Sequence, residues 1–472
     1  MLSKIQSYWV VFFTAVFVVS NSILIANEFY WLNLIPLILA IVLLAFLSLE
    51  YLLLIIAFFT PLSISLEGLD LGGIGMFVPT EPLLFGVLIL FFLKLFSGEK
   101  LDKKLLSYPI TYAILFYLVW MGFTIITSEI PLVSFKFLLS RLWFVVAFYF
   151  LGVQLFKRKK NIRGMIWLYI IPLCFVILNT TYKHALFHFD LESSHLVMYP
   201  FFKDHTRYGA VIAMLLPMSL YLLSTKKRRG LAIGLIAILL LGLVLSYTRA
   251  AWVSLIGAMA FAFVLKFRIS FVKIVFLVVV GTGVLLFSWS SIVMSLEKNS
   301  QDSSSTLSKH VESVSNISTD ASNLERINRW NCAIRMFKER PIMGWGPGTY
   351  AFQYAPFQRS GEKTIISTNQ GDLGNAHSEF LGPLAESGIL GMLSFLFLML
   401  MVYYKGMRLY YHLPKGDLKR LIFYTLLALT TYFIHGLLNN FLDTDKLAVP
   451  FWGFIAIIVA VDIYHRKEIS QE

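Results

Sequence analysis

Long, uninterrupted runs of apolar residues constrain the fold of this chain more than any other feature of its sequence. A helix that crosses a bilayer needs roughly 20 apolar residues in a row, whereas the strands of a membrane barrel alternate in polarity. The runs here are continuous, and 58% of the 472 residues are hydrophobic while only 14% are charged. A soluble chain would carry about 25% charged residues. With a mean hydropathy of +0.74, the sequence predicts an all-α polytopic membrane protein.

About 14 segments are apolar and long enough to cross the bilayer, and because the runs in region 30–66 are closely spaced, we expect about 12 to 14 transmembrane helices. No cleavable signal peptide is evident in the first segment. Cys174 and Cys332 lie in segments of different kinds, so no disulfide framework is expected. The predicted spans are 8–26, 30–48, 51–66, 78–96, 108–127, 134–155, 164–183, 206–224, 230–247, 250–265, 271–292, 383–404, 420–439 and 447–464.

The lysines and arginines of the short loops predict the orientation, because these residues are enriched on the cytoplasmic side of membrane proteins. If the helices alternate, every basic cluster falls on one side, and both termini are expected in the cytoplasm. The net charge of +13 is therefore interpreted as a topology signal, and no nucleic-acid partner is expected. The clusters lie at 100–104, 157–163, 226–229, 266–273, 405–420 and 466–467.

One long connection, 293–381, is predicted on the outer side, between the fourth- and third-last helices. It opens with the Ser-rich run "SLEKNSQDSSSTLSKHVESVSNISTD", whose composition is typical of a flexible segment. An amphipathic helix then ends at Pro341. The loop divides the chain into N-terminal helices (1–229), a central region that includes the loop (230–404) and C-terminal helices (405–472).

Glycines and tryptophans follow in the same loop. Gly346, within "GWGPG", allows either a close approach to a sugar or a tight turn after a helix. Trp330 and Trp345 offer rings that stack on sugars, although anchoring at the membrane interface is the more common role of such residues.

Two arginines stand at the outer ends of predicted helices and a third falls within one, all at positions where charge is costly. Between Arg229 and Lys266 the chain must cross outwards and return, with about 27 Å of helix for each crossing. This is less than a span plus a turn, so Arg249 is expected at the outer edge of the hydrocarbon. Arg249 either serves a function there or reaches the lipid phosphates. Arg207 begins a helix on the same side and is slightly more typical of an interface anchor. Arg141 falls within a helix, so we expect it to pair inside the bundle.

The segment "NAHSEFLGPLAESGILG" places His377, Glu379 and Glu386 where the next apolar run begins. A single histidine at a helix start is more often a polar cap than a catalyst. Arg326 and Arg329 lie on the loop helix, and by their spacing alone they are most typical of a solvated helix face. No motif of metal-ligand spacing lies near these residues, so no metal and no cofactor are expected.

Taken together, "SYTRAAW", "ERINRWNCAIRMFKERPIMGWGPGTY" and "NAHSEFLGPLAESGILGMLSF" resemble the Wzy_C superfamily of O-antigen ligases and related polymerases. The resemblance covers about residues 231–397. The elements "HTRYG", "TPLSISLEG" and "FVPTEPLLFG" also look similar to this family, the last two without an obvious chemical role. The Ser-rich insertion has no counterpart in the family pattern.

The resemblance implies a metal-independent integral-membrane glycosyltransferase with a GT-C-like fold in the bacterial inner membrane, its active site facing the periplasm. The donor would be a glycan on undecaprenyl diphosphate, and the acceptor the lipid A core or another glycan. By matching motifs, Arg249 and Arg326 would bind the diphosphate, with Arg207 and Arg329 as further candidates. His377 would activate or orient the acceptor hydroxyl. Glu379 or Glu386 would orient the imidazole or act as the base, and Arg141, Trp330 and Gly346 would support the site.

Other functions stay open at this point. The favoured reaction is the transfer of an O-antigen-like glycan to the lipid A core, and a polymerase that joins repeat units or a protein O-glycan ligase would use the same donor and motifs. A transporter or flippase would place ionisable residues near the bilayer midplane. Here the unusual charges gather at the outer edge, which favours surface chemistry.

Overall fold

Helices make up nearly all of the structure, as the apolar runs predict. The computed structural model describes residues 2–27, 29, 32, 48–66, 76–224, 228–288, 321–363, 367 and 374–466. The chain divides into two compact units, Met1–Ile55 and Ile56–Glu472. The first unit contains α1 (Leu2–Ala26), whose apolar side chains are largely exposed. The boundary falls within α3 (Leu49–Phe59).

The second unit contains the remaining elements. Its N-terminal half comprises η2 (Thr60–Leu62), β1 (Ile64–Ser65), β2 (Phe77–Val78), α4 (Thr80–Phe96), α5 (Lys103–Leu106), α6 (Pro109–Thr124), α7 (Pro131–Val145), η4 (Val146–Phe150), α8 (Leu151–Leu155), α9 (Lys159–Leu186), η5 (Ser193–His195) and α10 (His205–Leu222). Its C-terminal half comprises α11 (Arg229–Leu245), α12 (Arg249–Lys266), α13 (Phe271–Phe287), α16 (Ala321–Glu339), α17 (Tyr350–Gln353), η7 (Ala355–Phe357), η8 (Ser360–Glu362), α18 (Leu381–His412), α19 (Asp417–Leu438), α20 (Asp445–Ala460) and η9 (Val461–His465).

The helix lengths and compositions confirm the predicted class, an all-α polytopic membrane protein. Among the described residues, six helical segments are long and apolar enough to cross a membrane. They are Pro131–Leu155, Lys159–Leu186, Arg249–Lys266, Leu381–His412, Asp417–Leu438 and Asp445–His465. Shorter apolar helices are Val11–Ala26, Leu49–Leu62, Pro109–Thr124, Arg229–Leu245 and Phe271–Val284.

The predicted spans overlap helices wherever the structure describes them. Nearly all of the predicted span 30–48 and the whole Ser-rich run of the loop lie outside the described residues. The span predicted at 51–66 extends too far, because α3 ends at Phe59 and is followed by a 3-10 turn, Thr60–Leu62, that contains Pro61. Ile64–Ser65 then pairs antiparallel with Phe77–Val78.

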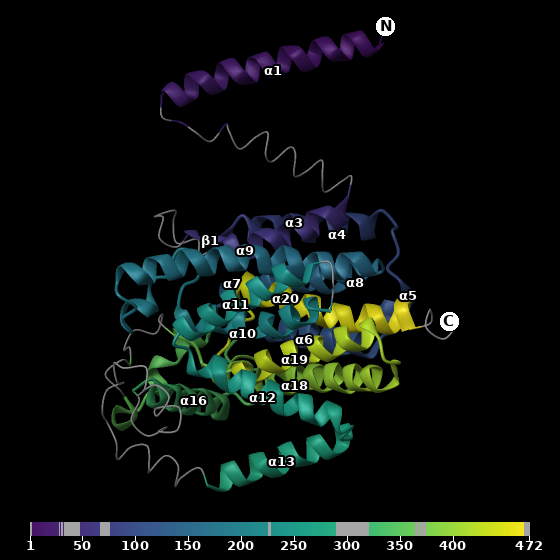
Figure 1. Ribbon diagram of the computed structural model, residues 1–472. Helices are drawn as coiled ribbons and strands as arrows, with labels where there is room; N and C mark the ends of the chain where they lie inside the picture. The colour runs from purple at the N-terminus through teal and green to yellow at the C-terminus, as the bar shows by residue number, and fades with distance from the viewer. Residues whose placement is uncertain are drawn as a thin grey trace. The chain divides into compact units, whose positions relative to one another are not determined.

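Helices α10 and α12 both pack against α19, while α6 and α16 pack against α18 (Figure 1). α20 is buried on all sides and carries the fully buried Trp452. The helix of the long loop, α16, therefore lies on α18, which follows the loop, and it occupies the place of the amphipathic helix predicted there.

Candidate active site

The start of α12 is fixed to the start of α10. Thr248, immediately before α12, donates its hydroxyl to the main-chain oxygen of His205 at 2.9 Å. Gly209 permits this approach, because a Cβ there would lie 2.7 Å from Thr248 Cβ. Arg249 is the first residue of α12 and is thereby held beside the first turn of α10.

A second arginine, Arg326, reaches the same region from α16. Burial, and then the positive charge of Arg249, lowers the pKa of the Arg326 guanidinium to about 10. His205 lies within electrostatic range of both arginines. The nearby charge of Arg249 disfavours the charged form of Arg326, and an anion that contacts both guanidiniums would be stabilised by both.

His377 stands in the loop that leads into α18, with a strained backbone. Its φ of 48° lies in the left-handed region, which residues other than glycine adopt rarely and often at functional sites. The Asn375 side-chain oxygen accepts a hydrogen bond from the His377 N–H at 2.9 Å. The Trp330 indole donates to the His377 carbonyl at 3.3 Å. The loop and α16 together fix the position of the imidazole.

The His377 imidazole is neutral at pH 7. Burial, and then the positive charge of Arg326, lowers its pKa to about 4. Its Nδ1 is buried and makes no hydrogen bond within the described part of the chain. The Asn439 side chain interacts with the imidazole and also lies 3.2 Å from His435 Nε2. A neutral imidazole has one nitrogen that accepts a proton.

Arg326 is therefore the residue that joins the group, since both Arg249 and His377 lie within electrostatic range of it. These three side chains come from the start of α12, from α16 and from the loop before α18. They gather in one region, which brings two guanidiniums and a neutral imidazole together.

Arg207 lies near this region but is engaged by its own helix start. It forms an ion pair with Asp204 at 3.0 Å and stacks over the Phe441 ring at 5.1 Å. Asp204 also caps α10 by accepting from the Arg207 N–H at 2.8 Å. These contacts make Arg207 part of the wall that holds the N-terminal turn of α10.

Arg329 is buried and bound within the loop. Its Nε lies 2.6 Å from a Glu325 carboxylate oxygen, and its guanidinium lies 3.9 Å from the centre of the Tyr354 ring. A Cβ at Gly374 would overlap this guanidinium at 2.6 Å. Between the two loop arginines, the geometry favours Arg326 as the partner of Arg249.

Glu379 faces a different set of groups from those around His377. Its Oε1 accepts hydrogen bonds from the Tyr432 hydroxyl at 2.5 Å, the Phe441 N–H at 2.9 Å and the Leu442 N–H at 3.0 Å. Burial raises its pKa, against the opposing effect of Arg141. Within the described residues, no hydrogen bond joins Glu379 to the His377 imidazole. Glu379 thus fixes the turn after α19.

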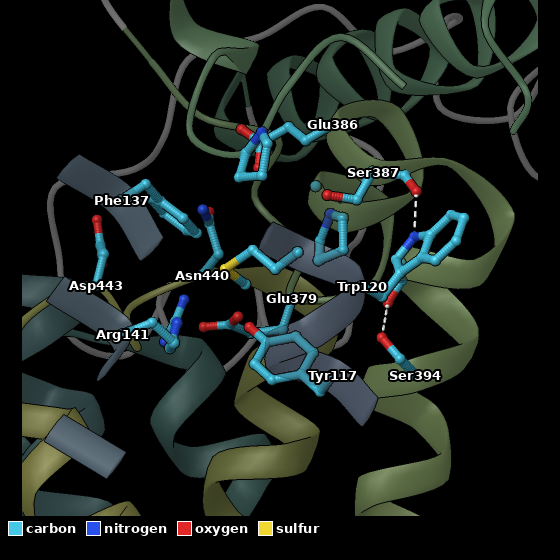
Figure 2. A pocket seen from close by; sticks show the side chains of 15 residues that line it. Tyr117, Trp120, Phe137, Arg141, Glu379, Glu386, Ser387, Ser394, Asn440 and Asp443 are labelled. Atoms are coloured by element: carbon cyan, nitrogen blue, oxygen red, sulfur yellow. Dashed lines mark hydrogen bonds between the residues drawn. The ribbon is translucent and has the colours of Figure 1, made fainter. Parts of the chain in front are cut away.

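Arg141 pairs inside the bundle, as predicted. Its guanidinium donates to the Leu442 carbonyl at 2.6 Å and helps to line a cavity of about 50 Å³. Figure 2 shows Arg141 and Glu379 close together, with Asp443 near Arg141 and Glu386 across the cavity. The volume suits a few water molecules and is too small for a sugar ring. Other residues that line it include Tyr117, Trp120, Asn440 and Ser387.

Glu386 and Gly346 join the Gly-rich turn to α18. Glu386 Oε1 accepts a hydrogen bond from the Tyr350 N–H at 3.0 Å, and its carbonyl accepts one from the Gly346 N–H at 2.8 Å. With φ at 111°, Gly346 tolerates no side chain, since a Cβ would lie 2.0 Å from Ser128 Oγ. Trp345 is buried beneath this turn. Of the two sequence interpretations, the structure shows the tight turn.

The elements "TPLSISLEG" and "FVPTEPLLFG" meet at the buried carboxylate of Asp445. Ser63 and Thr80 each donate a hydroxyl to Asp445 Oδ2 at 2.5 Å. The Lys446 ammonium lies 3.1 Å from Asp445 Oδ1 and 4.0 Å from the centre of the Phe77 ring. These elements hold the start of α20, directly after the turn that Glu379 fixes.

Sequence reasoning missed Asn439, Asp443 and His205. Asn439 directly follows α19 and interacts with the His377 imidazole, Asp443 lines the cavity beside Arg141, and His205 begins α10 near Arg326. The polar run "NNFLDTD" (439–445) between two apolar spans was the available signal for Asn439 and Asp443. Across the described residues, no three His, Cys, Asp or Glu side chains come together in a group that could hold a metal ion.

Comparison with known families gives a match. The family model for the O-antigen ligases (Wzy_C) matches residues 234–396, and this confirms the resemblance predicted from the motifs. The matched segment runs from α11 into α18 and includes Arg249, Arg326 and His377. The comparison with curated proteins gives no match.

Proposed function

Because residues 234–396 match the O-antigen ligase family, we propose that this membrane protein transfers a glycan from undecaprenyl diphosphate to an acceptor hydroxyl. In the favoured reaction, an O-antigen-like glycan is joined to the lipid A core at the periplasmic face of the bacterial inner membrane. The observation that supports this most directly is the grouping of Arg249 and Arg326 with His377.

Arg249 and Arg326 are suited to bind the diphosphate of the donor. When the bond between the sugar's anomeric carbon and the phosphate oxygen breaks, the electron pair stays on the diphosphate. Guanidiniums are always charged and bind phosphate oxygens bidentately, and fixed cations aimed at developing charge are a large catalytic term in a water-poor site. We assign Arg249 and Arg326 to the diphosphate, and Arg207 to holding the helix start beside them.

His377 suits the acceptor. A sugar hydroxyl attacks the anomeric carbon poorly until its proton is removed, and a neutral imidazole can accept that proton as the new carbon–oxygen bond forms. The diphosphate leaves as a stable anion, so no acid is required on the leaving side. Glu379 is assigned to positioning and not to proton transfer, because three hydrogen bonds hold its Oε1.

The test begins with deletion of the gene and separation of the cell's glycans on a gel. Loss of the polysaccharide ladder from lipid A core, with full-length glycan still on its lipid carrier, is expected. An accumulation of single repeat units would identify a polymerase, and an unchanged ladder would reject the proposal.

Purified protein then tests the chemistry. Transfer from the lipid diphosphate should survive EDTA, because the arginines supply the positive charge. A loss of activity that a divalent ion restores would contradict the metal-free mechanism.

A further inference from the structure

A second cavity lies at the opposite end of α12 from Arg249. Arg249 begins the helix and Lys266 ends it, so about 25 Å of helix separates the two. The cavity has a volume of about 540 Å³ and lies between this end of α12 and the connection from α18 to α19. Its lining consists of Ala262, Phe263, Lys266, Tyr410, Lys415, Gly416, Lys419, Arg420, Phe423 and Tyr424.

Positive charge dominates this cavity. Lys266, Lys415, Lys419 and Arg420 line it, and among the described residues no acidic side chain does. Arg268 and Lys415 lie within electrostatic range of Lys419. Like charges gathered in this way favour an anion that contacts several of them.

Asp417, on α19 near Lys419 and Arg420, makes its shorter contacts outside this cavity. Asp417 lies 2.8 Å from the Arg163 guanidinium, and it also accepts from the Tyr221 hydroxyl at 3.1 Å. Arg420 is farther from it, at 3.8 Å. The carboxylate is therefore directed to α9 and α10, away from the lysines.

The apolar part of the cavity continues onto the lipid-facing side of α12. Phe263 lines the cavity and is 58% exposed. Met259 and Ile256 precede it at helical spacing, 62% and 60% exposed. Because this stripe joins the basic cavity, an occupant can place an anionic group among the lysines and apolar chains along the helix.

We propose that this cavity binds the headgroup of an anionic phospholipid. Its phosphate contacts Lys266, Lys415 and Arg420, and its acyl chains follow the exposed stripe of α12. Basic pockets between membrane helices bind lipids of this class. A free phosphate has the same headgroup chemistry but has no acyl chains to contact the exposed stripe of α12. The inference does not depend on the proposed glycosyl transfer.

The test uses the full-length protein, purified in detergent and stripped of lipid. Cardiolipin and phosphatidylglycerol should raise the unfolding temperature and remain bound in native mass spectrometry, whereas phosphatidylcholine should do neither. Inorganic phosphate and glycerol phosphate test the headgroup alone. If either stabilises the protein as much as the lipids do, the site is a simple anion site and the lipid assignment fails.

The variant K266Q/K415Q/R420Q removes three exposed cations and should weaken cardiolipin retention at least tenfold. A matched variant, K103Q/K104Q/K159Q, removes the same charge from basic positions that do not line the cavity and should bind as the wild type does. Equal retention by both variants and the wild type would overturn the proposal. If the triple variant unfolds, the single variants K266Q and K415Q should each show a smaller loss of cardiolipin retention. Wild-type retention by both single variants would also overturn the proposal.

Discussion

The indole nitrogen of Trp330 donates a hydrogen bond to the main-chain carbonyl of His377, with 3.3 Å between the two atoms. Through this bond α16 holds the histidine loop, while Arg326 approaches the imidazole from the same helix. The backbone of His377 is in the left-handed region, so it needs such external support.

Replacing Trp330 with Phe tests this support. A smaller aromatic ring remains and the N–H is lost. Loss of this hydrogen bond should cost about 1 kcal/mol and lower kcat several-fold, with little change in the KM for the lipid-linked donor. Steady-state kinetics with lipid-linked donor are the measurement. Trp252→Phe on α12 is the matched control and should retain wild-type rates. A wild-type kcat in Trp330→Phe would show that the bond does not position the histidine.

The depressed pKa of His377 makes a prediction about stability. In the folded protein this pKa is about 4, and in the unfolded chain it is about 6.5. Between these values the unfolded state binds more protons, so the free energy of unfolding falls as the pH drops from about 6.5 towards 4. His377→Asn removes this group, and Asn tolerates the positive φ.

The unfolding temperature measured from pH 7.5 to pH 5 should therefore decline less steeply in His377→Asn than in the wild type. His412→Asn, at the exposed end of α18, serves as the control. Equal slopes in the wild type and His377→Asn would mean that the imidazole is not buried near Arg326.

The sequence predicted the helical segments well, because about 20 apolar residues in a row leave a chain few alternatives in a bilayer. It also predicted that Arg249, Arg326 and His377 would share a region, through the order of motifs around one long loop. The surroundings of Glu379 could not be predicted, since its donors come from residues 432–442. The partner of Ser63 and Thr80 could not be predicted either, because both donate to Asp445, which is far along the chain.

Glu379 should behave as a positioning residue. Glu379→Gln keeps an oxygen that can accept from Phe441 and Leu442, so transfer should stay within about tenfold of the wild type, whereas removal of a general base would cost about 10²–10⁴-fold. Glu379→Ala leaves Arg141 without this neighbour and several buried donors unpaired, and it should destabilise the protein by about 3 kcal/mol. Transfer rates are compared at equal amounts of folded protein. A loss above 100-fold in a stable Glu379→Gln protein would make the carboxylate catalytic.

The two loop arginines should separate in their effects. Arg326→Gln removes a cation that has Arg249 and His377 beside it, and transfer should fall at least about 100-fold while the unfolding temperature changes little. Arg329→Gln leaves the buried Glu325 without its ion-pair partner, so it should lower the unfolding temperature by several degrees. Among properly folded molecules, Arg329→Gln should retain most of the activity. If Arg329→Gln is stable and inactive while Arg326→Gln is active, the diphosphate is held by Arg329, and the grouping of Arg326 with Arg249 and His377 has another purpose.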